Sequence, residues 1–194
     1  MKMLTYPILP GKHIRLEPLR AEHRSGMQAA ANDPKLWEVT VTRGYGEFFE
    51  GWWEAAERGQ AAGTSVPYAV IHQTSGEVIG STSYLNLALA DDRLEIGSTW
   101  YARTYHGTAV NPESKLLLMR QAFEVMGIKR VEFCVDAINS HSRAAVTKLG
   151  ATQEGILRSH RWTQTGRRRD TVIFSVLDTE WAEVKRGLEG RLGK

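Results

Sequence analysis

The period of the hydrophobic pattern changes near the middle of the chain, and this change limits the fold more than any other feature. Upstream, residues 67–73, 78–87 and 94–102 alternate as strands do, and the turn residues Thr74 to Glu77 separate the first two. From Asn111 onward, apolar residues recur at helical spacing instead. A chain that uses both periods predicts an α/β fold with a mixed sheet.

The remaining segments continue this alternation of helices and strands. The other expected strands are residues 13–19, 130–137, 155–162 and 171–177, and the expected helices are residues 21–32, 45–62, 111–126, 139–149 and a terminal helix capped by Asp178 and Thr179. Short turns between the three central strands predict an antiparallel meander. No repeat and no Pro-, Gly- or Ser-rich linker divides the sequence, so we expect one domain over residues 1–194.

Composition excludes several classes of protein. Of the 194 residues, 42% are hydrophobic and 24% are charged, which is ordinary for a globular domain. The sequence contains no run of about 18 apolar residues, which a membrane span would need. It also has no apolar segment before Pro10 of the kind found in a secretory signal. The single cysteine, Cys134, has no partner for an internal disulfide or a cysteine-rich metal site. We therefore expect a soluble protein of the reducing cytoplasm.

Charge is nearly balanced over the whole chain but not locally. The 25 basic and 22 acidic residues give a net charge of +3, which is too small for a nucleic-acid-binding chain. The expected C-terminal hairpin, however, carries a cluster of arginines with no acidic residue among them. These are Arg158, Arg161, Arg167, Arg168 and Arg169. Two interpretations stay open, a solvated hairpin and a binding surface for an anionic ligand or an RNA-rich assembly.

The segment after Trp100 joins the end of a strand to the start of a helix through a short loop. Asn111 as cap and Pro112 at the first helical position predict a well-formed helix start. Unpaired backbone N–H groups at a helix start bind phosphate or pyrophosphate, and small residues such as Gly107 and Ala109 let the ligand approach the backbone. A plain strand-to-helix turn fits the same residues, so the loop alone leaves both interpretations open.

The run from Thr104 to Ala109 resembles motif A of the GNAT superfamily of acyl-CoA-dependent N-acetyltransferases, which reads Gln/Arg-x-x-Gly-x-Gly/Ala. Within that superfamily the chain looks most like the ribosomal-protein N-terminal acetyltransferases. Supporting segments follow in the family's order at residues 11–19, 94–97, 107–115, 139–150 and 169–172. The resemblance implies a mixed central sheet of about seven strands, flanked by helices, with a splayed strand pair that holds the cofactor.

The resemblance implies acetyl-CoA as co-substrate and no metal. It places the pyrophosphate on backbone amides from Gly107 to Val110, and the pantetheine arm between the strand ending at Tyr101 and the strand over residues 130–137. Asn139 matches the asparagine that binds the pantetheine arm in the family, although alone it predicts a helix cap. The expected cofactor-binding residues are Trp100, Tyr101, His106, Gly107, Thr108, Ala109, Val110, Asn111, Asn139 and Ser142.

Two departures from the family pattern bear on catalysis. Thr104 stands where motif A has Gln or Arg, and Val146 stands where many members have a tyrosine as general acid. The resemblance offers Ser142, one helical turn after Asn139, as the acid; the alternative is a serine that only supports the cofactor. Because a protonated amine cannot attack a thioester, a base is also needed. The resemblance points to Glu95, whose alternative role is to pair with an arginine.

The sequence leaves the acceptor open. It predicts transfer of acetyl to a primary amine, either a protein N-terminus of the ribosomal type or a small amine such as an antibiotic or polyamine; an acyl-CoA-binding domain without turnover is a further alternative. A covalent route through Cys134 is not expected, because the residue lies mid-strand with no adjacent base. The expected acceptor-binding residues are Trp37, Trp52 and Tyr68, each of which also fits a core role.

Partners beyond the two substrates are few in this interpretation. We expect no membrane partner, and no nucleic acid except through a ribosomal substrate. The family habit, together with a stripe of Trp181, Val184 and Leu188 on the terminal helix, leads us to expect a homodimer.

Overall fold

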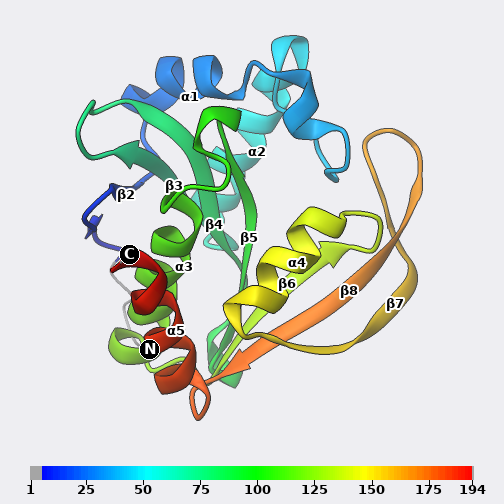
Figure 1. Cartoon of the computed structure of the whole chain (residues 1–194). Coiled ribbons are helices and arrows are strands. Elements are labelled where there is room, and N and C mark those ends of the chain that lie inside the picture. The colour runs from blue at the N-terminus through cyan, green and yellow to red at the C-terminus, as the bar shows by residue number, and fades with distance from the viewer. Residues whose placement is uncertain (1–5, 194) are drawn as a thin grey trace.

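The computed structural model describes residues 6–193 and contains one eight-stranded mixed sheet in the order β1-β2-β3-β4-β5-β6-β8-β7 (Figure 1). Its strands are β1 (Leu9–Pro10), β2 (Ile14–Pro18), β3 (Ser65–His72), β4 (Val78–Ala88), β5 (Arg93–Tyr101), β6 (Arg130–Asp136), β7 (Thr152–Trp162) and β8 (Arg168–Leu177). All neighbouring strands are antiparallel except β5 and β6.

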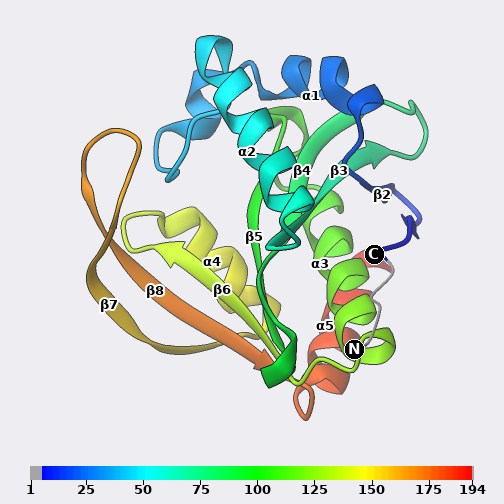
Figure 2. The same cartoon turned by 180° about the vertical axis from the view of Figure 1, so that it is seen from behind.

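Helices cover the two faces of the sheet unequally. They are α1 (Arg24–Ala31), α2 (Phe49–Ala61), α3 (Val110–Arg120) with a π-helical extension (Gln121–Val125), α4 (Ser140–Leu149) and α5 (Trp181–Leu192). α3, α4 and α5 pack on one face, and α1 and α2 pack on the opposite face of the N-terminal strands (Figures 1 and 2). In the described chain no helix covers that second face of β6, β8 and β7 (Figure 2). No helix of residues 6–193 combines the length and apolarity needed to cross a bilayer.

Side chains of β3 show how one strand serves two cores. Tyr68 and Val70 point into the larger core beneath α3, α4 and α5, whereas Ala69 and Ile71 point into the smaller core beneath α1 and α2. Successive side chains of a strand face opposite sides, so a strand buried on both faces is apolar throughout.

The only parallel pairing in the sheet is short. β5 and β6 pair through Arg93–Arg130, Leu94–Val131 and Glu95–Glu132, after which β5 continues to Tyr101 and β6 to Asp136 without contact between their ladders. The two halves of the sheet meet at the bottom of Figure 1 and separate towards its top. The splayed pair that the resemblance implies is therefore present.

We call the region where β5 and β6 separate the divergence, and a β-bulge on β5 lies within it. Ser98 has φ +47°, and the pairing with β4 jumps from Ser83–Gly97 to Ser81–Trp100. Because the bulge adds a residue, it reverses the alternation: Ile96 faces the larger core, and Trp100 faces the smaller core.

The expected elements and the antiparallel meander are confirmed, with local differences. β1 was not expected. The cap assignment at Asn111 is wrong: α3 begins at Val110, two residues before the expected first helical residue Pro112, and the hydroxyl of Thr108 accepts from the Val110 N–H at 3.3 Å. The cap at Asp178 and Thr179 is also wrong, because α5 begins at Trp181 with Glu180 as its N-cap.

The apolar stripe of α5 belongs to the core. Trp181, Val184 and Leu188 are buried in the larger core, and the ring of Trp181 lies 5.3 Å from that of Phe123. This removes the sequence argument for a homodimer, because the stripe is covered within the chain.

A buried carboxylate connects the N-terminal strands to α3. Glu113 accepts hydrogen bonds from the backbone N–H groups of Lys12 at 2.7 Å, His13 at 2.8 Å and Ile14 at 2.9 Å. Gly11 lies against it, where a Cβ would stand 2.7 Å from the Glu113 carboxyl carbon. One side chain thus satisfies three backbone donors of the loop that leads into β2.

We predict that Glu113→Ala lowers the free energy of unfolding by about 2–4 kcal/mol, because the buried N–H of Ile14 left without a partner costs about 1–3 kcal/mol and the partly buried N–H groups of Lys12 and His13 cost less. Denaturant titration measures the change. Glu57→Ala on α2 is the control, since Glu57 makes no hydrogen bond or ion pair within residues 6–193. A loss no larger than that of the control would contradict this role of Glu113.

Candidate functional site

The loop between β5 and α3 presents free backbone donors at a helix start. Gly107 has φ +74°, a conformation that glycine adopts without strain. The N–H groups of Gly107, Thr108 and Ala109 donate no hydrogen bond within residues 6–193. A Cβ on Gly107 would meet no atom within 4 Å, so the loop is open on this side. Free donors at the positive end of a helix form an anion site.

Two histidines bring this loop to α4. His106 is bonded through Nε2 to the main-chain oxygen of Tyr101 at 3.0 Å, and its ring stacks on His141 with centroids 6.0 Å apart. His141 lies in the first turn of α4, where the side chain of Asn139 caps the helix by accepting from the Ser142 N–H at 2.9 Å. The structure therefore brings together, at the top of the divergence, the loop, Tyr101, Asn139 and Ser142.

Thr104 and Val146, the two residues that depart from the family pattern, lie in different surroundings. Val146 is buried in the larger core and offers no proton, and Thr104 is exposed. The Ser142 hydroxyl is half-buried and has no hydrogen-bond partner within the described chain. Tyr101 turns its buried ring into the core, where its hydroxyl donates to Asn111 at 3.3 Å.

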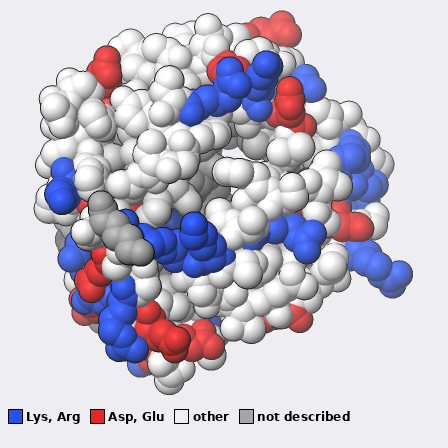
Figure 3. Space-filling view, viewed as in Figure 1, with Lys and Arg blue, Asp and Glu red and all other residues white. Residues whose placement is uncertain are grey.

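Figure 3 shows a deep hollow near the middle of the face that carries α3 and α4, beside the upper part of β5. Lysine and arginine side chains stand around this hollow. Basic side chains around a cleft raise the local concentration of anions.

Glu95 lies at the last position where β5 pairs with β6, on the sheet face opposite α3 and α4. Its carboxylate accepts from Asn86 Nδ2 at 2.6 Å and makes no ion pair with any described residue, so the alternative of an arginine partner is not seen. Burial raises the pKa of Glu95, and hydrogen bonds from Asn86 and Cys134 oppose the rise. A carboxyl group with a raised pKa takes up a proton more readily than an exposed one.

Cys134 lies beside this carboxylate, so the expectation that no base adjoins the thiol is wrong. Burial raises the pKa of the thiol to about 12, and the charge of Glu95 adds to the rise. The thiol therefore stays protonated and donates to Glu95, which keeps it from acting as a nucleophile.

Three tryptophans gather on the same face as Glu95. The ring centroids of Trp37 and Trp100 are 5.2 Å apart, those of Trp52 and Trp100 are 5.6 Å apart, and those of Trp37 and Trp52 are 6.5 Å apart. Trp37 is buried and donates to the main-chain oxygen of Ala31 at 2.9 Å, whereas Trp52 is half-buried. Tyr68 is not brought together with them, because it lies fully buried on the α3 side of the sheet, with its ring 6.0 Å from that of Tyr84.

A cavity of about 310 Å³ adjoins Trp52, between α2, the loop before it and the tip of the β7–β8 hairpin. Trp52 and Trp162 form its apolar walls. The hairpin tip is tied to the loop because Gln164 N–H donates to Val41 O at 2.8 Å and Arg43 N–H donates to Gln164 Oε1 at 2.6 Å. No pattern in the sequence predicts this contact, which joins segments more than 100 residues apart.

Sequence reasoning also missed Lys115, a buried lysine in α3. Its Nζ donates to Thr99 Oγ1 at 2.7 Å and contacts Thr82 Oγ1 at 3.5 Å, and no carboxylate of the described chain pairs with it. Desolvation lowers the pKa of Lys115 to about 7. The sequence feature that could have indicated its burial is its position among the apolar residues of the expected helix.

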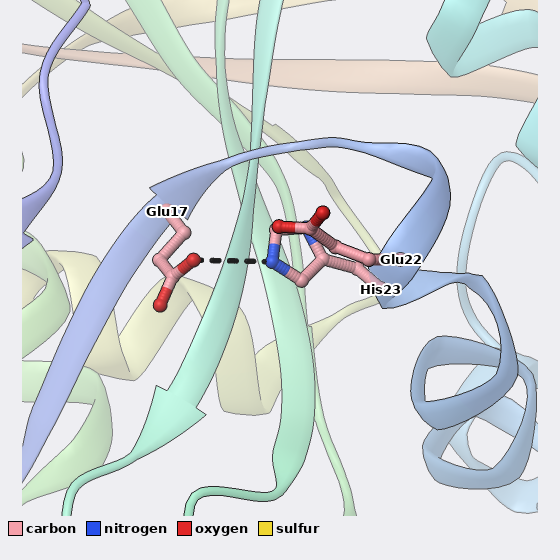
Figure 4. A group of neighbouring side chains, drawn as sticks. All are labelled: Glu17, Glu22 and His23. Atoms are coloured by element: carbon pink, nitrogen blue, oxygen red, sulfur yellow. Dashed lines mark hydrogen bonds and ion pairs between the residues drawn. The ribbon is translucent and has the colours of Figure 1, made fainter.

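One cluster has the residue types of a metal site. Ligating atoms of Glu17, Glu22 and His23 lie within 4.8 Å of one another (Figure 4). The backbone N–H of Arg20 donates to His23 Nδ1 at 3.1 Å, so Nε2 carries the proton and donates to Glu17 at 3.2 Å. Glu17 also accepts from Arg15 at 2.6 Å. These bonds use the atoms that a metal would need, and they hold the start of α1 against β2.

We predict that Lys115 makes stability rise with pH. Its folded-state pKa of about 7 lies below the 10.5 of an exposed lysine, so between these values the unfolded chain holds a proton that the folded chain lacks. Stability therefore increases from the lower value to the higher one, with a limiting slope of about 1.4 kcal/mol per pH unit.

Urea titrations at about pH 7.5 and about pH 9.5 measure this slope, which Lys115→Met should remove. Lys148→Met on the exposed face of α4 is the control, and it should keep the slope. Equal slopes in the wild type and in Lys115→Met would show that the lysine is charged when buried.

Comparison with known proteins agrees with this geometry. Residues 13–152 match the model of the acetyltransferase (GNAT) domain family. The Bacillus subtilis (strain 168) protein named "Putative ribosomal N-acetyltransferase YdaF" is 31% identical over 106 residues, which span 55% of this chain and 57% of that protein.

Solved structures give the same answer. A GCN5-related N-acetyltransferase from Brucella melitensis superposes with TM-score 0.87 at 31% identity, over 94% of this chain and 84% of that one. Mycobacterium smegmatis RimJ in complex with CoA-disulfide shares the fold, with TM-score 0.77 at 19% identity over 92% and 90% of the two chains. The chain belongs to the GNAT acetyltransferase family and is an acyl-CoA-dependent N-acetyltransferase.

Proposed function

We propose that the chain transfers acetyl from acetyl-CoA to the α-amine of a protein N-terminus, of the ribosomal-protein type. The observation that carries the proposal is the position of Glu95, a buried carboxylate at the last residue of β5 that pairs with β6, on the face opposite the loop between β5 and α3. In this arrangement the two substrates meet from opposite faces of the divergence.

The residues of the loop and of α4 fit acetyl-CoA. The free amides of Gly107, Thr108 and Ala109 suit the pyrophosphate, and the backbone edges of β5 and β6 beyond Glu95 suit the amides of the pantetheine arm. The side-chain amide of Asn139 keeps its N–H groups for the same arm, since its oxygen is used in the helix cap. Bound there, acetyl-CoA supplies an activated acetyl group.

Glu95 acts as the general base in this proposal. An N-terminal α-amine has a pKa of about 8, much lower than that of a lysine side chain, so a carboxylate whose pKa is raised by burial is sufficient to take its proton. The freed amine then attacks the thioester directly, and Cys134 takes no part because its thiol stays protonated.

Ser142 donates a hydrogen bond to the departing thiolate. Its free hydroxyl stands in the first turn of α4, next to the cap at Asn139, where Val146 leaves no tyrosine to do the same work. A serine hydroxyl is a weak acid, so the contribution is stabilisation of developing charge rather than complete proton transfer.

The acceptor side favours a peptide end over a polycationic amine. Arginines of the β7–β8 hairpin lie on the face of Glu95, and the cavity beside Trp52 has apolar walls. A polyamine or aminoglycoside would need acidic walls instead. The names of relatives such as the ribosomal N-acetyltransferase of Bacillus subtilis support the same choice.

An acceptor screen tests the proposal. Peptides that carry different N-termini, polyamines and aminoglycosides are incubated with acetyl-CoA, and mass spectrometry records any gain of an acetyl group. We expect acetylation at the N-terminal amine of a peptide. Acetylation of small amines alone would contradict the acceptor class, and coenzyme A binding without product from any amine would contradict turnover.

We predict that Gly107→Glu abolishes acetyl-CoA binding, since it places a negative side chain at the free amides of the loop. Calorimetry measures the affinity. Gly76→Glu is the matched control, because Gly76 has φ +72° against +74° for Gly107 and is equally open, but lies in the β3–β4 turn. Unchanged affinity in Gly107→Glu would place the phosphates elsewhere.

We predict that Glu95→Gln lowers turnover about 10²–10⁴-fold while acetyl-CoA affinity stays unchanged, because a general base contributes about that factor. Steady-state assays of thiol release measure the rate. Glu132→Gln is the control, since Glu132 pairs with Glu95 in register but is bonded to Arg130 at 2.8 Å. Proportional losses of rate and acetyl-CoA affinity in Glu95→Gln would assign Glu95 to binding.

Ser142→Ala should lower turnover by about 10²-fold, the low end of the range for a positioned acid, with little change in acetyl-CoA affinity. The same assays of thiol release and calorimetry apply. If rate and affinity fall together, Ser142 is a binding residue. If neither changes, the thiolate leaves without help from this serine.

A further inference from the structure

We propose that Arg161 and Arg169 form an anion-binding site beside Glu95, which selects acceptors that carry a carboxylate close to the amine that is acetylated. The inference rests on the proposed function and adds to it the acceptor chemistry: an N-terminal peptide with an acidic side chain at its first or second residue. Four observations on the β6–β8–β7 half of the sheet support it.

The first observation is the shared face. Glu95 and its register partner Glu132 lie on the sheet face opposite the larger core. Asp136 lies four residues after Glu132 on β6 and pairs with Thr171 of β8, so both share the face of Glu95. Arg169 precedes Thr171 by two residues on β8, so its side chain is on the same face. Arg161 on β7 is the register partner of Arg169, which puts both guanidinium groups on the face of Glu95.

The second observation is a guanidinium group that is buried but not fully used. Arg169 is only 5% exposed, and its Nη2 donates to the main-chain oxygen of Cys134 at 2.7 Å. Its Nε has no partner in the described chain, although it is shielded from solvent. A buried donor without a partner costs about 1–3 kcal/mol, so a ligand that supplies an oxygen gains that energy.

The third observation is that Arg161 is free. It is exposed and makes no hydrogen bond or ion pair with any residue of 6–193. Two like charges at one register position repel each other, and an anion between them removes that repulsion. Arg161 and Arg169 also lie near enough to Glu95 for their charges to oppose the rise in its pKa, which places the anion site next to the proposed base.

The fourth observation is that neighbouring charges of the hairpin and of β6 already have partners. Asp136 accepts from Arg167, and Arg168 donates to Ser159 and stacks on Trp162 with its guanidinium carbon 5.0 Å from the ring centroid. No described carboxylate makes a hydrogen bond or ion pair with Arg161 or Arg169. A substrate carboxylate is then the group that completes the site, and a second positive charge on the acceptor would be repelled.

A second consequence concerns the amine itself. Positive charges near an amine favour its neutral form. The two arginines thus help Glu95, because the acceptor amine arrives in the state that can attack.

Peptide binding tests the inference without requiring turnover. Two peptides that differ only in Asp or Asn at the second residue, and a third with Lys there, are titrated by calorimetry into the full chain saturated with coenzyme A, which has no acetyl group to transfer. The variants are Arg161→Gln and Arg161→Lys. Arg158→Gln is the matched control, since Arg158 is exposed on the same strand and has no partner in the described chain.

We expect the wild type to bind the Asp peptide about tenfold more tightly than the Asn peptide, as for a single hydrogen bond to a charged group. Arg161→Gln should reduce this ratio to about one, Arg161→Lys should keep part of it, and Arg158→Gln should leave it unchanged. Thermal unfolding of each variant shows that the fold is kept.

Equal binding of the Asp and Asn peptides by the wild type would overturn the inference, as would tightest binding of the Lys peptide, no binding of any peptide, or an unchanged ratio in Arg161→Gln. The proposed function fails separately, only when acetyl-CoA and peptides together give no acetylated N-terminus by mass spectrometry. N-terminal acetylation with no preference for Asp would refute the anion site and leave the proposed function in place.

Discussion

Backbone pairing joins β5 to β6 over three residues only in the described chain, and the site depends on how the strands part after Glu95. A sheet that continued in parallel register would satisfy every backbone donor and acceptor on those edges and leave nothing for a ligand. The bulge at Ser98 turns β5 away, while β6 remains paired with β8 on its other edge. The result is two free backbone edges that separate over the larger core.

Groups on the two faces of this divergence differ in kind. The face of α3 and α4 presents free amides, a helix start and histidine rings, which suit an anionic nucleotide. The opposite face presents the buried Glu95, three tryptophans and the arginines of the hairpin, which suit an amine on a peptide. In the proposed direct transfer, the amine loses its proton on one side of the sheet while the thiolate leaves on the other.

Local pattern predicted much of this arrangement. Alternation and helical spacing located most elements, and the cap at Asn139 followed from one residue and its position. The helix start was misplaced by two residues because α3 begins at Val110, whose N–H donates to the Thr108 hydroxyl, and not after a cap at Asn111. The loop residues and Glu95 were named through the family resemblance, since spacing alone left a plain turn in competition.

What the sequence did not predict depends on contacts between distant segments. The face of Tyr68 follows from the register of β3, which a strand buried on both sides does not reveal. Packing between distant segments also produces the hydrogen bond between Gln164 and Val41 and places Glu95 beside Cys134. It buries Lys115 against Thr99 with no carboxylate of the described chain to form an ion pair. Arginine content marked the hairpin, but only the register of β7 with β8 separated Arg161 and Arg169 from their neighbours.

Amide hydrogen exchange with and without acetyl-CoA tests the central claim most directly, because it reports on the free edges themselves. If the divergence holds the co-substrate, acetyl-CoA slows exchange at the amides of residues 96–101, 107–110 and 133–136, and leaves the β2–β3 ladder unchanged. Protection confined to other segments, with none at the edges of β5 and β6, would contradict the account.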